Sequence, residues 1–224
     1  MSRRGTAWAV AFGLGAVCHT LPCQAGGTDK GTAVVRNASR AYQALSSFQA
    51  QFQQHFEDKN LDMPDSKGIL YQEGKSRFAM RFTDPPKDAL VADGTKFWMY
   101  LPSSAPGKVL RFPQQSHPTY GTNLMGTFLD NAVDRYRITY VNSEVIDGHV
   151  TDAVIMEPMA NDMPFRRATV WFDRDLGLPR RLDIEESRDH HRVLNLTQLL
   201  LNRPIAADIF LCTRFPKGTP VIDQ

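Results

Sequence analysis

Residues 80–102, together with the start of the strand that leads into them, constrain the fold more than any other part of this 224-residue chain. The segment 77–82 reads RFAMRF, and this alternation is the two-residue period of a strand with one apolar face. Asp93-Gly94 then predicts a tight hairpin turn. The next strand, residues 96–101, reads KFWMYL and is apolar on both faces. We therefore expect a β-sheet that contacts apolar material on both sides, a core on one side and a cavity on the other.

The N-terminus has the pattern of a secretory signal peptide. A basic segment precedes an apolar run at residues 7–17, and small residues precede Gly26, which predicts cleavage after Ala25. The apolar run is too short to cross a bilayer. Residues 1–25 are thus expected to be removed, and residues 26–224 have the length of a single domain. We expect the mature protein in the periplasm.

The three cysteines and the net charge limit the possible classes of protein. Cys18 and Cys23 would leave with the signal peptide, so Cys212 would remain without an internal disulfide partner. Cys212 is expected to be a small buried hydrophobic residue. Lipidation of Cys18 or Cys23 is an alternative, for which the neighbouring residues are a poor context. The net charge of +2 and the absence of a basic stripe exclude nucleic acid as a partner.

Two segments have the spacing of amphipathic helices. In residues 32–47 one face carries the apolar side chains, which are Val34, Val35, Ala38, Tyr42 and Leu45. In residues 120–133 the apolar stripe is narrower and consists of Leu124, Met125, Phe128 and Leu129. The second helix is either an ordinary helix packed on a sheet or a lid over a cavity.

Most other segments alternate like strands. Residues 48–56 carry an apolar side chain at nearly every second position, which favours a strand over a helix. Residues 102–118 contain four prolines and predict a connecting loop with a short strand at 109–112. Beyond residue 134 only strands are predicted, at 135–146, 150–157, 168–173, 179–186, 193–201 and 209–215. This pattern predicts a mainly antiparallel α+β fold, with about ten strands in a single, strongly curved sheet and two or three helices.

The order and spacing of several short motifs resemble the LolA-like periplasmic outer-membrane lipoprotein carriers. These motifs are Phe48-x-Ala50-x-Phe52-x-Gln54, Gly68-x-Leu70, Arg77-Phe78, Pro85, Asp93-Gly94-x-x-x-Trp98-x-Tyr100-x-Pro102, Phe172-Asp173 and Phe215-Pro216-Lys217-Gly218. The resemblance implies a LolA/LolB-like unclosed β-barrel capped by helices, with an apolar cavity between sheet and lid. It also implies a carrier that accepts lipid-modified proteins from an inner-membrane ABC transporter of the Lol type and delivers them to an outer-membrane receptor.

The candidate lipid-binding residues follow from strand parity and from the lid stripe. They are Phe78, Met80, Phe82, Trp98, Tyr100, Leu124, Met125, Phe128, Val154, Met156, Val170, Phe172, Ile184 and Leu196. Trp98 and Tyr100 share one face of their strand, whereas Phe97, Met99 and Leu101 share the other. Parity does not decide between the two faces. The recurrence of Trp98 and Tyr100 in the family slightly favours these two, and a structural role for them is an equal alternative. The same residues are also compatible with the core of a β-sandwich.

One departure from the family pattern concerns the lid. Typical members carry an arginine, shortly before the position of Phe78, that holds the lid closed. Here the matching stretch is Glu73-Gly74-Lys75-Ser76, and the candidates to replace the arginine are Lys75 and Arg77. A lysine offers a point charge rather than a planar fork. This departure leaves two alternatives open: a LolA-like carrier of a different lipid, such as a glycolipid or the acyl product of a dedicated pathway, and a lipid-sensing interaction module.

No catalytic residue, cofactor or metal is predicted. The chain has no HExxH, CxxC or nucleophile-elbow motif. Glu185, Asp189 and His191 of one hairpin could share a face as metal ligands, but a hairpin tip normally carries solvated charge. We therefore expect a monomer whose ligand is an acylated protein or a lipid, and not an enzyme.

Overall fold

The structure is a computed structural model that describes residues 26–58, 64–113, 123–161, 163–186 and 190–224. The predicted signal peptide, residues 1–25, lies outside these residues, and its cleavage stays a prediction. The described strands are β1 (Ser47–Asp58), β2 (Ser66–Glu73), β3 (Arg77–Asp84), β4 (Ala89–Asp93), β5 (Lys96–Tyr100), β6 (Val109–Pro113), β7 (Tyr136–Ile146), β8 (His149–Pro158), β9 (Arg167–Asp173), β10 (Pro179–Glu185), β11 (His190–Leu201) and β12 (Val221–Asp223).

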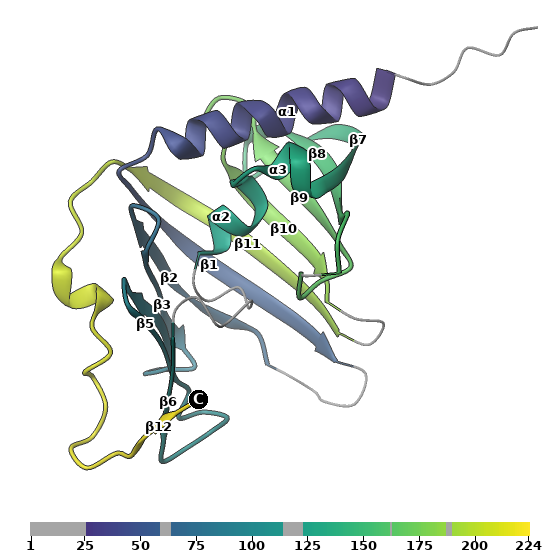
Figure 1. Cartoon of the computed structure of the whole chain (residues 1–224). Coiled ribbons are helices and arrows are strands. Elements are labelled where there is room, and N and C mark those ends of the chain that lie inside the picture. Colours follow the sequence, from purple (N-terminus) through teal and green to yellow (C-terminus); the bar gives the residue numbers. More distant parts are fainter. Residues whose placement is uncertain (1–25, 59–63, 114–122, 162, 187–189) are drawn as a thin grey trace, which may run out of the picture.

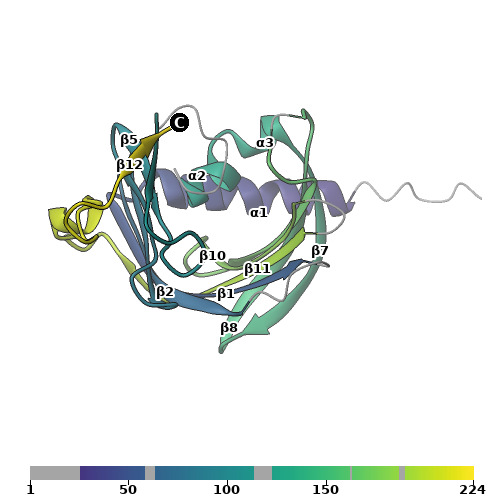
Figure 2. The same ribbon diagram turned by 90° about the horizontal axis from the view of Figure 1, so that it is seen from below.

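These twelve strands form one sheet in the order β12-β6-β5-β4-β3-β2-β1-β11-β10-β9-β8-β7. Neighbouring strands are antiparallel, except that β12 runs parallel to β6. The sheet curls into a trough, but its end strands β12 and β7 do not pair with each other (Figures 1 and 2). The predicted mainly antiparallel, unclosed barrel is therefore confirmed, with twelve described strands instead of about ten.

Three helices cover the concave face of the sheet (Figures 1 and 2). They are α1 (Gly26–Gln43), α2 (Leu124–Leu129) and α3 (Ala132–Arg135). The single helix predicted at residues 120–133 is thus divided in two, and its first three residues lie outside the described ranges. The break falls at Asn131, whose φ of 51° is a left-handed conformation that asparagine tolerates better than most residues.

The apolar core lies between the concave face and the helices. In β1, Phe48, Ala50 and Phe52 are buried, whereas the glutamines between them are more exposed. Strand register then aligns apolar residues side by side across four neighbouring strands, in the row Leu194, Leu182, Val170 and Val154. The row exists because each hairpin keeps the same parity, so one apolar face is continuous across the trough.

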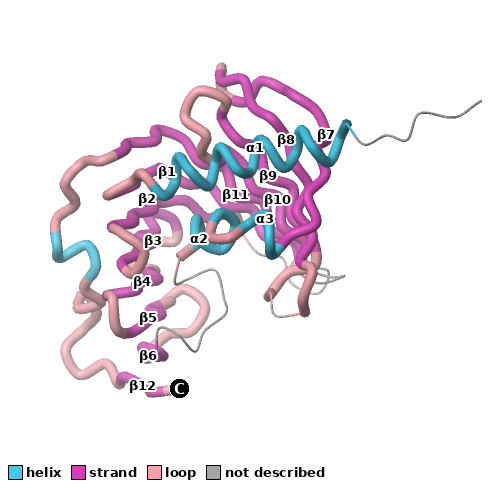
Figure 3. The backbone as a smooth tube through the Cα atoms, turned by 45° about the horizontal axis from the view of Figure 1, so that its top comes forward, coloured by secondary structure: helices cyan, strands magenta, loops and turns pink. Residues whose placement is uncertain are grey.

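The prediction of a strand at residues 209–215 is wrong. A short 3₁₀ helix, Ala207–Phe210, and an extended segment instead cross the outer face of the sheet before β12 returns to β6 (Figure 3). The Arg81 guanidinium donates to the carbonyls of Ile209 (2.6 Å) and Leu211 (2.7 Å). These side-chain hydrogen bonds hold the segment on the sheet in place of the backbone hydrogen bonds of a paired strand. The side chains of Phe210 and Cys212, two residues apart, are still buried against the sheet, and this alternation explains why the sequence pattern resembled a strand. The prediction that Cys212 is buried is confirmed.

Candidate functional site

Twelve of the fourteen predicted lipid-binding residues lie on the concave side, in one apolar cluster. All of them are buried except Phe82, which is partly buried against the cluster. Nine belong to strands, and Leu124, Met125 and Phe128 belong to α2. The sheet and the candidate lid therefore contribute to the same apolar interior, as strand parity and helix spacing predicted.

Trp98 and Tyr100 lie on the opposite face, in a second cluster beneath the C-terminal segment. The Trp98 Nε1 donates to Asp93 at 2.7 Å, and the Tyr100 ring lies 5.8 Å from that of Phe215. Placing these two residues with the other twelve was thus incorrect. Phe97 and Met99 take the inner positions instead. Parity alone could not decide between two apolar faces, because the segment that covers the outer face is about a hundred residues away in sequence.

The α2 side chains fill the concave face. Leu124, Met125, Phe128 and Leu129 are all buried, and the Phe128 ring lies 5.2 Å from that of Phe165 in the β8–β9 connection. An acyl chain on this face would compete with these side chains for the same apolar contacts. The α2 side chains thus occupy the apolar contacts that the concave face offers.

Polar contacts fix the first turn of α2. The Asn123 side chain caps the helix, because its Oδ1 accepts from the Gly126 backbone N–H at 2.7 Å. Its Nδ2 donates to the Tyr42 hydroxyl of α1 at 2.9 Å, and the Gln72 Nε2 of β2 donates to the same hydroxyl at 2.8 Å. Burial raises the pKa of Tyr42, so the hydroxyl stays protonated and available to this network. We call Tyr42, Gln72 and Asn123 the polar latch.

Further contacts hold the end of α2. The Ser39 Oγ of α1 donates to the Leu129 carbonyl at 2.8 Å, and the Tyr136 hydroxyl donates to the Thr127 carbonyl at 2.6 Å. The Lys75 ammonium lies 3.3 Å from the Asp130 carboxylate at the C-cap. Arg77, the other candidate to replace the family arginine, pairs instead with Glu73. Of these two candidates, Lys75 is therefore the one that pairs with the C-cap of α2, where the Arg135 guanidinium also donates to the Asp130 carbonyl at 3.2 Å.

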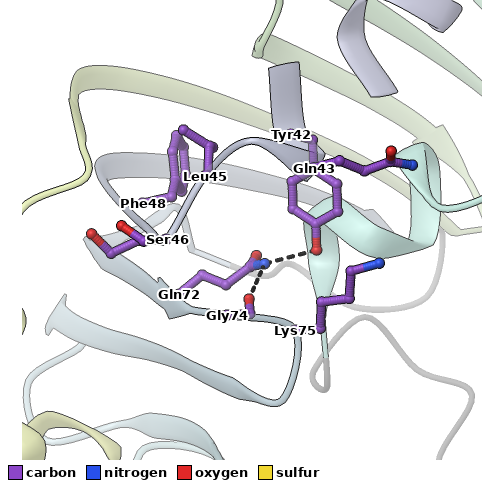
Figure 4. Close-up of a pocket in the computed structure, with 9 residues that line it drawn as sticks. Tyr42, Gln43, Leu45, Ser46, Phe48, Gln72, Gly74 and Lys75 are labelled. Carbon is purple, nitrogen blue, oxygen red and sulfur yellow. Dashed lines mark hydrogen bonds between the residues drawn. The ribbon is translucent and has the colours of Figure 1, made fainter. Parts of the chain in front are cut away.

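A small pocket of about 40 Å³ lies beside the polar latch (Figure 4). It is lined by Tyr42, Gln43, Leu45, Ser46, Ser47, Phe48, Gln72, Gly74 and Lys75. The pocket borders the apolar interior, because Tyr42 and Phe48 belong to the concave cluster and Leu45 packs against it. Gln72 and Ser46 had no predicted role, since single polar residues within strand and turn patterns carry no distinctive signal.

A larger groove of about 900 Å³ lies on the outer face, beside the tip of the β7–β8 hairpin. Polar side chains dominate its floor, among them Gln51, Gln53, Asn195 and Thr197. Amide and hydroxyl groups would lose hydrogen bonds to water if an acyl chain covered them. The concave face is therefore the better acyl-binding surface.

The possible metal ligands do not form a site within the described ranges, where no group of three suitable side chains comes together. The His191 side chain of β11 contacts Asp183 of β10 and Glu57 of β1, the two strands on either side of β11. Asp189 lies outside the described residues.

Comparison with known proteins gives the family. The family model described as outer membrane lipoprotein carrier protein LolA matches residues 43–213. The chain belongs to the LolA family. Membership indicates a lipid- or lipoprotein-binding, carrier-like protein. No curated protein sequence matches the chain. In the described part of the chain, no helix is both long and apolar enough to cross a membrane.

Solved structures share the LolA-type fold at low sequence identity. An uncharacterised conserved protein from Thermus thermophilus aligns with a TM-score of 0.56 and 10% identity, covering 87% of this chain and 99% of that one. MucB in the Pseudomonas aeruginosa MucA/MucB complex aligns with a TM-score of 0.50 and 15% identity, covering 82% of this chain and 61% of MucB. The lipoprotein LppX of Mycobacterium tuberculosis aligns with a TM-score of 0.46 and 15% identity, covering 80% and 99% of the two chains.

Proposed function

We propose that this protein is a periplasmic carrier that holds acyl chains between its concave sheet and α2, and that it shuttles lipoproteins from the inner to the outer membrane. The observation that carries the proposal is the continuous apolar surface of the trough, which the side chains of a six-residue helix cover. In this proposal the mature chain begins at Gly26 and acts as a monomer. An inner-membrane ABC transporter of the Lol type would supply the cargo, and an outer-membrane receptor would accept it.

Energetics support reversible binding. Burial of a 16-carbon chain is worth on the order of 12 kcal/mol, at about 0.8 kcal/mol for each methylene. Burial of the four apolar side chains of α2 is worth on the order of 6–12 kcal/mol, at roughly 1.5–3 kcal/mol each. An acyl chain that displaces α2 would expose the four apolar side chains of this helix. The free-energy cost of that exposure would offset most of the free energy gained by burying the acyl chain. The carrier could then bind cargo and still release it.

A photo-crosslinking amino acid at Phe172, on the floor of the trough, tests this proposal. We expect adducts with acylated proteins in periplasmic extracts, because the Phe172 side chain would contact the acyl chains. The matched control carries the crosslinker at Trp98, an aromatic residue on the outer face of the same sheet. Equal adduct yields at both positions, or none at Phe172, would contradict acyl binding in the trough.

A second candidate function keeps the site and changes the cargo. The stretch Glu73-Gly74-Lys75-Ser76 lacks the lid-closing arginine of typical family members, and this departure favours a lipid other than a lipoprotein, such as a glycolipid or a dedicated acyl product. Lipids extracted from the purified protein distinguish the two. A free lipid in place of an acylated peptide would support the second candidate. A lipid-sensing role would instead require a protein partner that binds only the loaded form.

A further inference from the structure

The polar groove on the outer face of the sheet has no part in the proposed acyl binding. Its volume is about 900 Å³, and residues of β1, β2, β10 and β11 form most of its floor. The tip of the β7–β8 hairpin forms its wall, through residues 144–147. Figure 2 shows this hairpin projecting on the convex side of the sheet, away from the three helices. The groove is therefore a second candidate site, separate from the trough.

Strand register places polar side chains of the floor in one row. Arg181 of β10 pairs with Asn195 of β11. Asn195 pairs in turn with Gln53 of β1, and Gln53 pairs with Lys67 of β2. Three strand spacings of roughly 4.8 Å separate the two cations, so the row is about 14 Å long. A chain-like ligand could contact all four side chains at once.

The uncharged side chains of the floor have unused hydrogen-bonding groups. Among the described residues no hydrogen-bond partner contacts the side chains of Gln51, Gln53, Asn195 and Thr197. Each amide or hydroxyl offers both a donor and an acceptor. The hydroxyl groups of a sugar ring also donate and accept, whereas an acyl chain does neither. The floor therefore matches a carbohydrate.

Other polymers fit the groove less well. Each floor strand β1, β2, β10 and β11 is already paired on both sides, so an extended peptide cannot add to the sheet there as a new strand. The lining carries two cations, Lys67 and Arg181, and two carboxylates, Glu144 and Asp147. This balance gives no basic stripe for nucleic acid.

Arg181 is the cation of the groove that has no carboxylate partner within the described part of the chain. Its guanidinium carbon lies 5.0 Å from the centre of the Trp171 ring, and this cation–π contact orients the side chain. Its Nε is buried, so a ligand can reach only the terminal nitrogens. Lys67, in contrast, lies 3.9 Å from Asp84, and Glu144 accepts from the Trp171 Nε1. The two terminal N–H groups of a guanidinium match a carboxylate.

We propose that this groove binds an oligosaccharide that carries a carboxylate group. The carboxylate accepts from the terminal nitrogens of Arg181, and the sugar hydroxyls exchange hydrogen bonds with the amides of Gln53 and Asn195. On the wall, Val145 is 65% exposed and offers an apolar contact to the C–H groups of a sugar ring. The site lies on the opposite face from the trough, so it does not depend on the proposed function.

Two sugars that differ only at C6 test the site by isothermal titration calorimetry on residues 26–224. Cellotetraose is a neutral β-1,4-linked tetramer of glucose, and the corresponding tetramer of glucuronic acid has a carboxylate at each C6. We expect the acidic tetramer to bind about tenfold more tightly, because only it can accept from Arg181 as a carboxylate. Tetraglutamate has carboxylates but no hydroxyls, and it should bind about tenfold more weakly than the acidic tetramer. Equal affinity of any two probes that include the acidic tetramer, or binding of none, would overturn the proposal.

Three variants locate the binding. Arg181→Met removes the charge and keeps a long side chain beside Trp171, so the preference for the acidic tetramer should disappear. Gln53→Leu should weaken the binding of both sugars about fivefold. Arg137→Met is the control, because Arg137 is an exposed residue of β7 outside the groove, and both affinities should stay unchanged.

A persistent preference in Arg181→Met would overturn the assignment of the carboxylate. Uptake of a lipophilic dye, measured in parallel, should be equal in all three variants and the wild type, since the trough lies on the other face. Failure of the sugar probes with normal dye uptake would therefore overturn this site and leave the carrier proposal intact. The comparison of the probes on the wild type gives a decisive result even where a variant fails to fold.

Discussion

At the scale of single residues, a few polar side chains decide how the apolar interior is closed. The Tyr42 hydroxyl connects α1, β2 and the first turn of α2, because Gln72 and Asn123 both donate to it. Lys75 contacts Asp130 at the other end of the helix. Opening of α2 must therefore break these contacts in addition to exposing its apolar side chains.

Lys75→Arg should close the lid more firmly. A guanidinium can donate two parallel hydrogen bonds to the Asp130 carboxylate, whereas an ammonium acts as a point charge. We expect the affinity of the empty protein for a lipophilic dye to fall about two- to fivefold at low salt. Arg77→Lys is the matched control, because Arg77 pairs with Glu73 and not with the lid. An unchanged or higher dye affinity in Lys75→Arg would contradict this role.

Asp152 and Arg174 make stability depend on pH. Hydrogen bonds from Arg174, joined by those from Ser143 and Tyr140, hold the pKa of Asp152 well below its ordinary value of 3.8, although burial opposes them. Because the folded-state pKa is the lower one, this stabilisation is present above about pH 4. It is lost as the pH falls through the folded-state pKa.

Asp152→Asn tests this pH dependence. At pH 7 the variant should lose on the order of 1–2 kcal/mol of unfolding free energy, because the charged hydrogen bonds weaken. Between pH 5 and pH 2 its melting temperature should fall less than that of the wild type, measured by circular dichroism. Asp147→Asn, an exposed position in the turn of the same hairpin, should follow the wild-type curve. Parallel curves for Asp152→Asn and wild type would show that Asp152 does not contribute.

At the scale of elements, α2 is short and depends on its surroundings. A six-residue helix is too short to be stable by itself in water. Its stability must therefore come from its cap at Asn123, its contacts with α1 and the burial of its apolar side chains. Each of these would be lost or weakened on opening, so helix formation and lid closure are expected to be coupled.

Asn123→Ala should open the lid. The substitution removes the N-cap of α2 and its hydrogen bond to Tyr42, at a cost of about 0.5–2 kcal/mol. We expect faster hydrogen exchange at Phe128 and Leu129 and a several-fold higher affinity for a lipophilic dye. Asn142→Ala, on the exposed part of β7, is the control and should change neither quantity. Unchanged exchange in Asn123→Ala would mean that the cap does not hold the lid.

At the scale of the whole molecule, the sheet forms a trough with two unjoined edges. Because β12 and β7 are not paired with each other, the distance between the two walls is not fixed by a closed hydrogen-bond ladder. Such a trough can widen when a ligand replaces the side chains of α2. The C-terminal segment covers the outer face of β3–β6, which is consistent with the concave face as the proposed acyl-binding surface.

Native mass spectrometry of residues 26–224, purified from periplasm without detergent, tests the carrier at this scale. We expect a monomer that carries a ligand with at least one acyl chain, because the trough offers a continuous apolar surface. A triacylated protein or peptide would support lipoprotein transport, and a free glycolipid would support the alternative cargo. An empty protein that also takes up no lipophilic dye would contradict both.

Local sequence patterns predicted most of the strands, their parity and most of the apolar interior. Alternation in β1 and β3 and from β8 to β11 is a local property of the chain, so Phe78, Val154, Val170 and Leu196 were assigned correctly to one face. The order of motifs gave the family and hence the unclosed barrel. These features depend on neighbouring residues and on spacing, both of which are visible in sequence.

Long-range contacts, in contrast, determine which face of β5 points inward, how the C-terminal segment runs and what holds α2 in place. Trp98 lies outside because a segment about a hundred residues later covers it, and Arg81 binds that segment through backbone carbonyls. The polar latch unites Tyr42, Gln72 and Asn123 from three separate elements. Such contacts form between segments that are distant in sequence, so no local pattern predicts them. Alternation assigns the residues of a strand to two faces, but it does not predict which segment packs on each face.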